Sequence, residues 1–259
     1  MAKTNGYGTT NGAHKQGPKT AKEQMGFIDD AMDNLEGFEQ INANTMAIPF
    51  VRILQKLSPQ LNKQKPQFLP DAEEGVWFNT VTKELLGDNI QVIVLKFEHV
   101  YIEWLPDRGG FVSYHSPENA ERLAVDKTFG KWQTADGNSL QESYAYICMI
   151  VGHEDEGIVV MSFSSSAIKM AREWNRLMTT HVMDNGKRAL PYYLVWALKA
   201  QYTENDQGSW YSPSVSYAGY ISEDQYSILS TERKALPNRN VDYSALEDKS
   251  NKAGDDAEF

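Results

Sequence analysis

Short runs of β-branched and aromatic residues, separated by turn-forming residues, dominate the central part of the chain. The runs IQVIVLKF (90–97), HVYIEW (99–104), ESYAYICMIVG (142–152) and IVVMSF (158–163) are typical of strands, as are 76–81, 111–114, 190–203 and 209–218. The segment 153–157 joins two of these runs and predicts a hairpin. The pattern predicts a mainly β fold of five to seven strands with two or three short helices, arranged as a small β-barrel or a curved sheet with insertions.

Helical periodicity is confined to a few segments. It is clearest over 164–178, where Ile168, Ala171, Trp174, Leu177 and Met178 form an apolar stripe. Shorter helical patterns occur at 27–35, within 116–131 and at 221–229, and the apolar run 48–61 resembles a strand. Strands and helices do not alternate as βαβ units, and no repeat of 20–50 residues occurs. A doubly wound fold and a repeat architecture are therefore not expected.

The two ends of the chain differ from its body. Residues 1–24 consist mostly of Gly, Thr, Asn and Lys, and they predict a disordered basic arm, because they hold too little apolar surface to offset the entropy of ordering. Residues 25–237 are expected to form a single domain. Residues 238–259 are polar and acidic, and they predict a disordered tail.

The net charge of −10 would seem to exclude nucleic acid, because phosphate binding depends on Lys and Arg. The charge is unevenly spread, however. Residues 29–39 hold five acidic and no basic residues, and residues 242–259 hold six acidic residues and two lysines. Most of the acidic excess thus lies in two peripheral segments, and the body can present a basic surface.

Two groups of residues in the body suit the binding of a single strand. The stretch 52–65 carries four basic and no acidic residues, and three basic residues of the 164–178 helix follow i, i+3, i+7 spacing on one face. The candidate phosphate contacts are Arg52, Lys56, Lys63, Lys65, Lys169, Arg172 and Arg176, and the candidate base-stacking rings are Trp77, Tyr101, Trp210 and Tyr211. The alternatives are a solvated basic face and core packing of the rings.

No catalytic constellation is found in the sequence. It contains neither GxxxxGK[ST] nor GxGxxG after a strand, and its five histidines form no HExxH or HxH pair. Its single cysteine, Cys148, excludes an intrachain disulfide and a Cys-based zinc cluster. We therefore expect no enzyme activity, no cofactor and no metal site. No apolar run reaches the roughly 18–20 residues of a membrane span and no signal peptide is apparent, which favours a soluble cytoplasmic protein.

The last seven residues, AGDDAEF, carry a resemblance. An acidic tip that ends in an aromatic residue is similar to that of bacterial and tailed-phage single-stranded DNA-binding proteins, and the blocks PFVRILQKLSPQL, FNTVTKELLG, VYIEW and MSFSSSAIKMAREWNRLM resemble phage replication-module proteins of this size. The resemblance implies an OB barrel with a DNA-binding groove. It also implies a tail that recruits replication or recombination proteins and competes with DNA for the groove. Its partner-binding tip would be Asp255, Asp256, Glu258 and Phe259.

These observations favour a sequence-independent single-stranded DNA-binding protein of phage replication or recombination. It would act in the host cytoplasm, as a monomer or homodimer. Two alternatives remain at this point: a phage structural or host-interaction protein without a nucleic-acid role, and an enzyme of nucleic-acid metabolism such as a nuclease.

Overall fold

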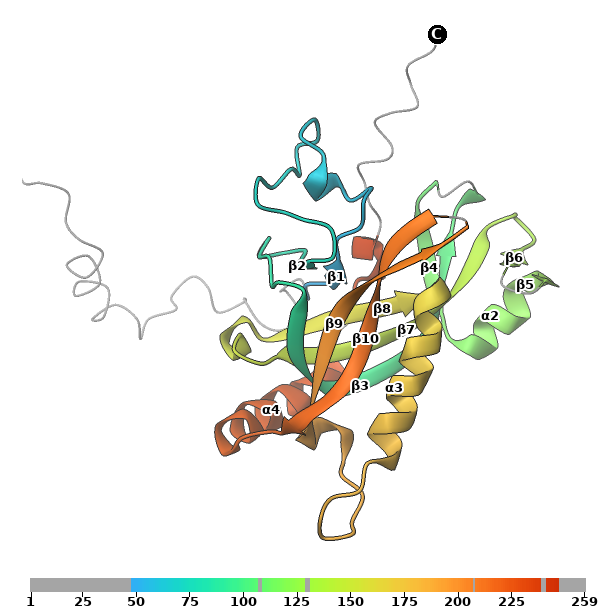
Figure 1. The fold of residues 1–259 in the computed structure, drawn as a ribbon. Coiled ribbons are helices and arrows are strands. Elements are labelled where there is room, and N and C mark those ends of the chain that lie inside the picture. Colours follow the sequence, from blue (N-terminus) through green and yellow to red (C-terminus); the bar gives the residue numbers. More distant parts are fainter. Residues whose placement is uncertain (1–47, 107–108, 129–130, 207, 239–240, 247–259) are drawn as a thin grey trace, which may run out of the picture. The chain divides into compact units, whose positions relative to one another are not determined.

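The computed structural model of the chain describes residues 48–106, 109–128, 131–206, 208–238 and 241–246 (Figure 1). The expected mainly β fold is confirmed, with an eight-stranded antiparallel sheet and a few helices. The sheet strands are β3 (Asn89–Trp104), β4 (Phe111–His115), β5 (Ala124–Thr128), β6 (Lys131–Thr134), β7 (Ser139–Ile150), β8 (Ile158–Ser164), β9 (Leu194–Asn205) and β10 (Gly208–Tyr220). The basic arm 1–24 and the helical pattern at 27–35 lie outside the described residues.

The long strand β3 organises the sheet. One edge of β3 pairs with β7, while the other edge pairs first with β9 and then with β4. The pairs β7–β8 and β9–β10 extend the sheet on either side, and β7 and β8 form the predicted hairpin. The sequence predicted two strands at 90–97 and 99–104. They are instead one strand with a register shift between Val94 and Lys96, because no turn-forming residue interrupts the segment.

The paired strands follow the order β8–β7–β3–β9–β10, and residues 50–55 contact both outermost strands, β8 and β10. Strands β1 (Val51–Ile53) and β2 (Trp77–Asn79) form a small separate sheet, so only three residues of the strand-like run 48–61 are a strand. Next to β1, Phe50 bridges Val160 of β8 in parallel. At the other end, Gln55 Nε2 donates to the carbonyl oxygen of Tyr211, and the Tyr211 N–H donates to Gln55 Oε1, each at 2.9 Å. Phe50 and Gln55 thus connect β8 with β10.

The remaining elements are helices and short turns. They are η2 (Pro59–Leu61), α2 (Pro117–Leu123), η4 (Glu154–Glu156), η5 (Ser165–Ala167), α3 (Ile168–Thr180), η6 (Pro191–Tyr193), α4 (Glu223–Ala235), η7 (Leu236–Asn238) and η8 (Tyr243–Leu246). Helix α2 lies with β4, β5 and β6 in the long connection between β3 and β7 (Figure 1). Within the part of the chain that the structure describes, no helix is both long and apolar enough to cross a membrane.

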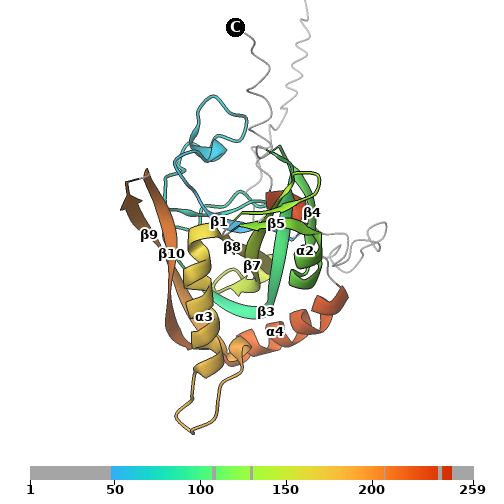
Figure 2. The same ribbon diagram turned by 90° about the vertical axis from the view of Figure 1, so that its right-hand side faces the viewer.

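Helix α3 lies between β8 and β9 in the sequence and packs against β7, β8 and β10 (Figure 2). Its Ile168, Ala171, Trp174 and Met178 are buried as the stripe predicted, whereas Leu177 is partly exposed. The Trp174 ring stacks on Tyr146 of β7 at a centroid distance of 4.4 Å. The Tyr146 hydroxyl lies 2.9 Å from the Ala171 carbonyl oxygen, and burial raises the pKa of this phenol. Helix α3 is thus anchored to β7 by both packing and a hydrogen bond.

The packed part of the chain continues past residue 238, where the sequence predicted that a disordered tail begins. Val241 and Tyr243, which fall in the predicted disordered tail 238–259, are buried against Val100 and Ile102 of β3. The Tyr243 hydroxyl donates to Glu98 at 2.7 Å. The expected start of the tail at residue 238 is therefore wrong. The apolar side chains of Val241 and Tyr243 cover the outer face of the sheet. The polar composition of residues 238–259 did not indicate this packing.

Candidate nucleic-acid interface

A row of aromatic rings lies on one face of β3 and β7. Another part of the same face packs against α3. We call Phe97, His99, Tyr101, Trp132 and Tyr144 the aromatic row. The first three alternate along β3, so their side chains share one face of the sheet. In the register of β3 and β7, His99 lies directly opposite Tyr144. Trp132 comes from β6, in the connection between β3 and β7.

Each ring of the aromatic row contacts the next one. Phe97 meets Tyr144 edge-on at 5.3 Å between centroids, and Tyr144 meets His99 at 4.8 Å. His99 lies 5.7 Å from Tyr101, which stacks on Trp132 at 5.0 Å with 20° between the planes. The aromatic row is therefore a continuous surface across three strands. Such edge and stacked contacts hold each ring in a defined orientation.

The aromatic row is open to solvent, unlike the rest of the same face. Val92, Val94 and Cys148 lie earlier on that face and are buried in the core with α3. Phe97 is 38% exposed, and the other four rings are half-buried. Partly exposed rings that are fixed in place suit base stacking, because a ring that is already ordered loses little entropy when a base binds.

Basic side chains border the aromatic row. Arg172 of α3 approaches Tyr144, with its guanidinium carbon 5.9 Å from the ring centroid and Nε 3.3 Å from the hydroxyl oxygen. Its side chain remains 61% exposed. The hydrogen bond to Tyr144 and the nearby Glu142 raise the pKa of Arg172, which keeps it cationic. Lys127 of β5 lies over Trp132 at 5.4 Å.

One carboxylate also lies among these groups. Glu142 of β7 is 3.3 Å from Arg172 Nη2 and 3.0 Å from His99 Nε2. It pairs with Tyr101 in the β3–β7 register, and burial together with this carboxylate raises the pKa of Tyr101. Tyr101 is consequently a neutral ring at physiological pH. Glu142 holds Arg172 beside the rings, although its charge would weaken the attraction for phosphate.

The structure brings two predicted residues, Tyr101 and Arg172, together in this surface. Lys169 and Arg176 are exposed on α3, as their spacing with Arg172 predicted. The basic residues of the stretch 52–65 lie elsewhere: Arg52 is half-buried in β1, Lys56 and Lys63 are exposed, and Lys65 is half-buried in the loop after η2. Lys56 and Lys63 line a pocket with Leu57, Ser58 and Leu61.

Trp210 and Tyr211 lie on β10, which is separated from β3 by β9 in the sheet. Both are half-buried, and they line a cavity of about 220 Å³ together with Ile53, Gln55 and Ser164. The Tyr211 ring packs directly on Gly75, whose φ of +83° and contact with the ring both require glycine. Gly75 therefore covers one side of the Tyr211 ring, and that side is not accessible to a base.

The sequence placed Trp77 among the candidate base-stacking rings, and the structure contradicts this assignment. The Trp77 indole is completely buried in the core with Val51, Ile90 and Trp196, so it cannot stack on a base in this structure. Both Trp77 and Phe78 of β2 are buried because β2 is covered on each face, and a three-residue strand has no alternation from which a solvent side could be read.

The sequence did not single out four members of the aromatic row. Phe97 and His99 alternate with Tyr101, and this alternation was a usable signal. Tyr144 and Trp132 join them only through the strand register. The proposed partner-binding tip, Asp255, Asp256, Glu258 and Phe259, lies outside the described residues.

The described residues thus define a mainly β protein in which a fixed, partly exposed aromatic surface adjoins a basic helix. The chain belongs to the family of Pam3 phage gp34-like proteins, whose family model matches residues 19–241. It is accordingly a protein of a phage family. No curated protein and no solved structure matches it.

Proposed function

We propose that the protein binds single-stranded DNA without sequence preference, through the aromatic row and the basic face of α3, in phage replication or recombination. The observation that carries the proposal is the continuous row of fixed rings beside Arg172. Every base has a π face, so stacking tolerates any sequence, and cationic groups supply the contacts to phosphate. No bond is made or broken, and the protein acts as a binding protein rather than as an enzyme.

The strand topology supports the OB barrel within this proposal. Taken in chain order, β3, β7, β8, β9 and β10 pair as first with second, second with third, fourth with first, and fourth with fifth. Helix α3 lies between the third and fourth strands. This strand order supports the proposal of a five-stranded Greek-key OB barrel, a fold in which nucleic acid binds across the sheet and the loops at its border. The aromatic row combines the first two strands with β6 of the first connection.

The direct test is a titration with a labelled 30-nucleotide oligo(dT), followed by gel shift and by tryptophan fluorescence. We expect binding in low salt, quenching of Trp132, and much weaker binding to a duplex of the same length, because paired bases cannot stack on protein rings. No shift of the oligonucleotide in low salt, with or without residues 242–259, would contradict the proposal. Copurification with phage particles without DNA affinity would favour a structural role instead.

Removing the basic face of α3 tests the phosphate contacts. The variant in which Lys169, Arg172 and Arg176 are all changed to Ala should bind oligo(dT) more weakly. Its plot of log affinity against log salt should be shallower by about 2, because each phosphate contact on a single strand contributes roughly 0.7 to the slope. The control replaces Lys199 and Lys234, two exposed lysines of β9 and α4, with Ala. If the triple variant and the control have the same slope, this helix face is only solvated.

The acidic tip is proposed to recruit a replication or recombination protein. Deleting residues 255–259 should leave affinity for oligo(dT) unchanged or raise it, because removal of three acidic groups lessens repulsion of phosphate. It should also abolish capture of the phage or host replication protein in a pull-down from infected cells. A marked loss of DNA affinity would show that the tip contributes to the DNA site itself.

A further inference from the structure

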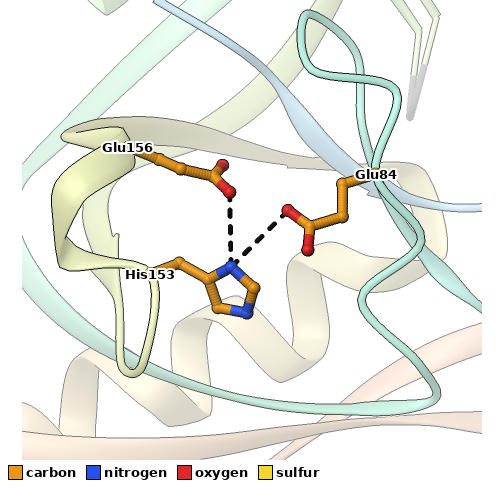
Figure 3. A group of neighbouring side chains, drawn as sticks. All are labelled: Glu84, His153 and Glu156. Carbon is orange, nitrogen blue, oxygen red and sulfur yellow. Dashed lines mark hydrogen bonds and ion pairs between the residues drawn. The ribbon is translucent and has the colours of Figure 1, made fainter. Parts of the chain in front are cut away.

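A second cluster of functional side chains lies away from the aromatic row. Glu84 comes from the loop between β2 and β3, while His153 and Glu156 belong to the turn between β7 and β8 (Figure 3). We call these three residues the Glu–His–Glu cluster. His153 Nδ1 is 3.5 Å from Glu84 Oε2 and 3.3 Å from Glu156 Oε1. Figure 3 shows both carboxylates directed at the same ring nitrogen.

The separations match those within a metal coordination sphere. One ligand atom from each side chain lies within 4.8 Å of the other two. Metal–ligand bonds of about 2.0–2.2 Å in a tetrahedral zinc site place neighbouring ligand atoms roughly 3.3–3.6 Å apart. The two nitrogen–oxygen separations, 3.3 and 3.5 Å, fall in this interval. A cation could bind with little movement of the three side chains.

The surroundings hold the cluster in this arrangement. Asn79 of β2 is fully buried, and its Nδ2 donates to Glu156 Oε2 at 3.1 Å, which leaves Oε1 directed at His153. A buried partner of this kind fixes a ligating carboxylate and strengthens its binding to metal. The three side chains themselves are 22–38% exposed, so an ion has access from solvent.

The two carboxyl groups also lie close together, with one oxygen of Glu84 and one oxygen of Glu156 within 4.8 Å of each other. Two facing carboxylates repel each other unless a proton or a cation lies between them. One imidazole and two carboxylates form a donor set that suits Zn²⁺ and its first-row neighbours better than Mg²⁺ or Ca²⁺, which favour oxygen ligands alone.

We propose that the Glu–His–Glu cluster binds one divalent transition-metal cation of the Zn²⁺ type. With three protein ligands, the fourth position is taken by water. The cation joins the β2–β3 loop to the β7–β8 turn. Because Glu154 of the same turn accepts from Gln225 of α4, the cation also stabilises the contact between that turn and the helix. The sequence indicated no metal site, since Glu84 and His153 are too far apart in the chain to form a short motif.

The test is a titration of the metal-free full chain with ZnCl₂ by calorimetry, with Co²⁺ absorption as a second readout. We expect one specific site with micromolar affinity. The variants Glu84→Gln and His153→Ala should each weaken binding by 10-fold or more. Glu118→Gln and His181→Ala, which change the same residue types outside the cluster and its turn, should bind Zn²⁺ as the wild type does. Circular dichroism verifies that each variant is folded, and Glu84→Gln preserves side-chain shape if His153→Ala does not fold.

Equal Zn²⁺ affinity in the wild type and Glu84→Gln would overturn the proposal, as would no specific binding below 1 mM. Either result would mean that the cluster is only a set of ion pairs between His153 and the two glutamates. The test involves no DNA, so its outcome is independent of the proposed strand binding.

Discussion

Changing both Tyr101 and Trp132 to Ala is expected to lower affinity for oligo(dT) by about 100-fold or more. The two rings stack on each other at 5.0 Å and form one end of the aromatic row. Loss of a base-stacking ring costs roughly 1–3 kcal/mol, which corresponds to about a 5- to 150-fold change for each base. Fluorescence anisotropy of a labelled 30-mer at fixed salt measures the effect.

The control for this double variant is Tyr226→Ala. Tyr226 is an exposed tyrosine of α4 that lies against Tyr193 and contacts no member of the aromatic row. It should bind oligo(dT) as tightly as the wild type. The conservative variant Tyr101→Phe keeps the ring and should retain most of the affinity. Equal loss in Tyr226→Ala and in the double variant would show that general destabilisation, rather than stacking, caused the weaker binding.

Trp174→Ala should reduce the free energy of unfolding by about 3–5 kcal/mol, the cost typical of deleting a large buried aromatic side chain. Trp174 is completely buried and contacts the rings of Tyr146, Phe163 and Trp196. Its removal leaves a cavity where α3 meets the sheet. Urea unfolding monitored by circular dichroism gives the difference, provided that the transition remains two-state.

Trp174→Phe is the matched control. It retains an aromatic ring, and it deletes an indole N–H for which the described residues offer no hydrogen-bond partner. It should therefore cost less than Trp174→Ala, because most of the packing is preserved and no hydrogen bond is broken. If Trp174→Ala unfolds at the wild-type urea concentration, α3 is not anchored through this residue.

Because Arg172 is exposed on the flank of α3 and is not part of this buried stripe, the two sets of variants separate binding from stability. Arg172 is exposed and packs beside Tyr144, whereas Trp174 is enclosed. Replacement of Arg172 should change DNA affinity with little effect on unfolding. Replacement of Trp174 should change unfolding first, and DNA binding only as α3 loses its place beside the aromatic row.

The elements of the fold could be predicted where the pattern is local. The β7–β8 hairpin was identified from two β-branched runs around one turn, and α3 from an apolar stripe with helical spacing. The single long β3 was mistaken for two strands that divide at Glu98, although no turn-forming residue lies there and the bulge is between Val94 and Lys96. Val241 and Tyr243 were missed for another reason: their burial depends on a sheet surface distant in the sequence.

The candidate site was predicted only in part. Tyr101 and Arg172 were identified because an aromatic strand and a basic helix face are visible in the sequence. Tyr144 and Trp132 were not, since the pairing of β3 with β7 and β6 brings them beside Tyr101 from far along the chain. Trp77 was assigned to the wrong group, because the sequence of a three-residue strand does not show which of its faces are covered.

The sequence by itself determined that this is a mainly β chain with one strong amphipathic helix and basic residues on that helix. Side-chain alternation and helical spacing depend only on neighbours along the chain. Only the tertiary structure decided which rings share one surface and that Glu84 meets His153 and Glu156. Those contacts depend on strand register and on loops that approach each other in space, and a shift of one residue in register would turn every ring to the other face of the sheet.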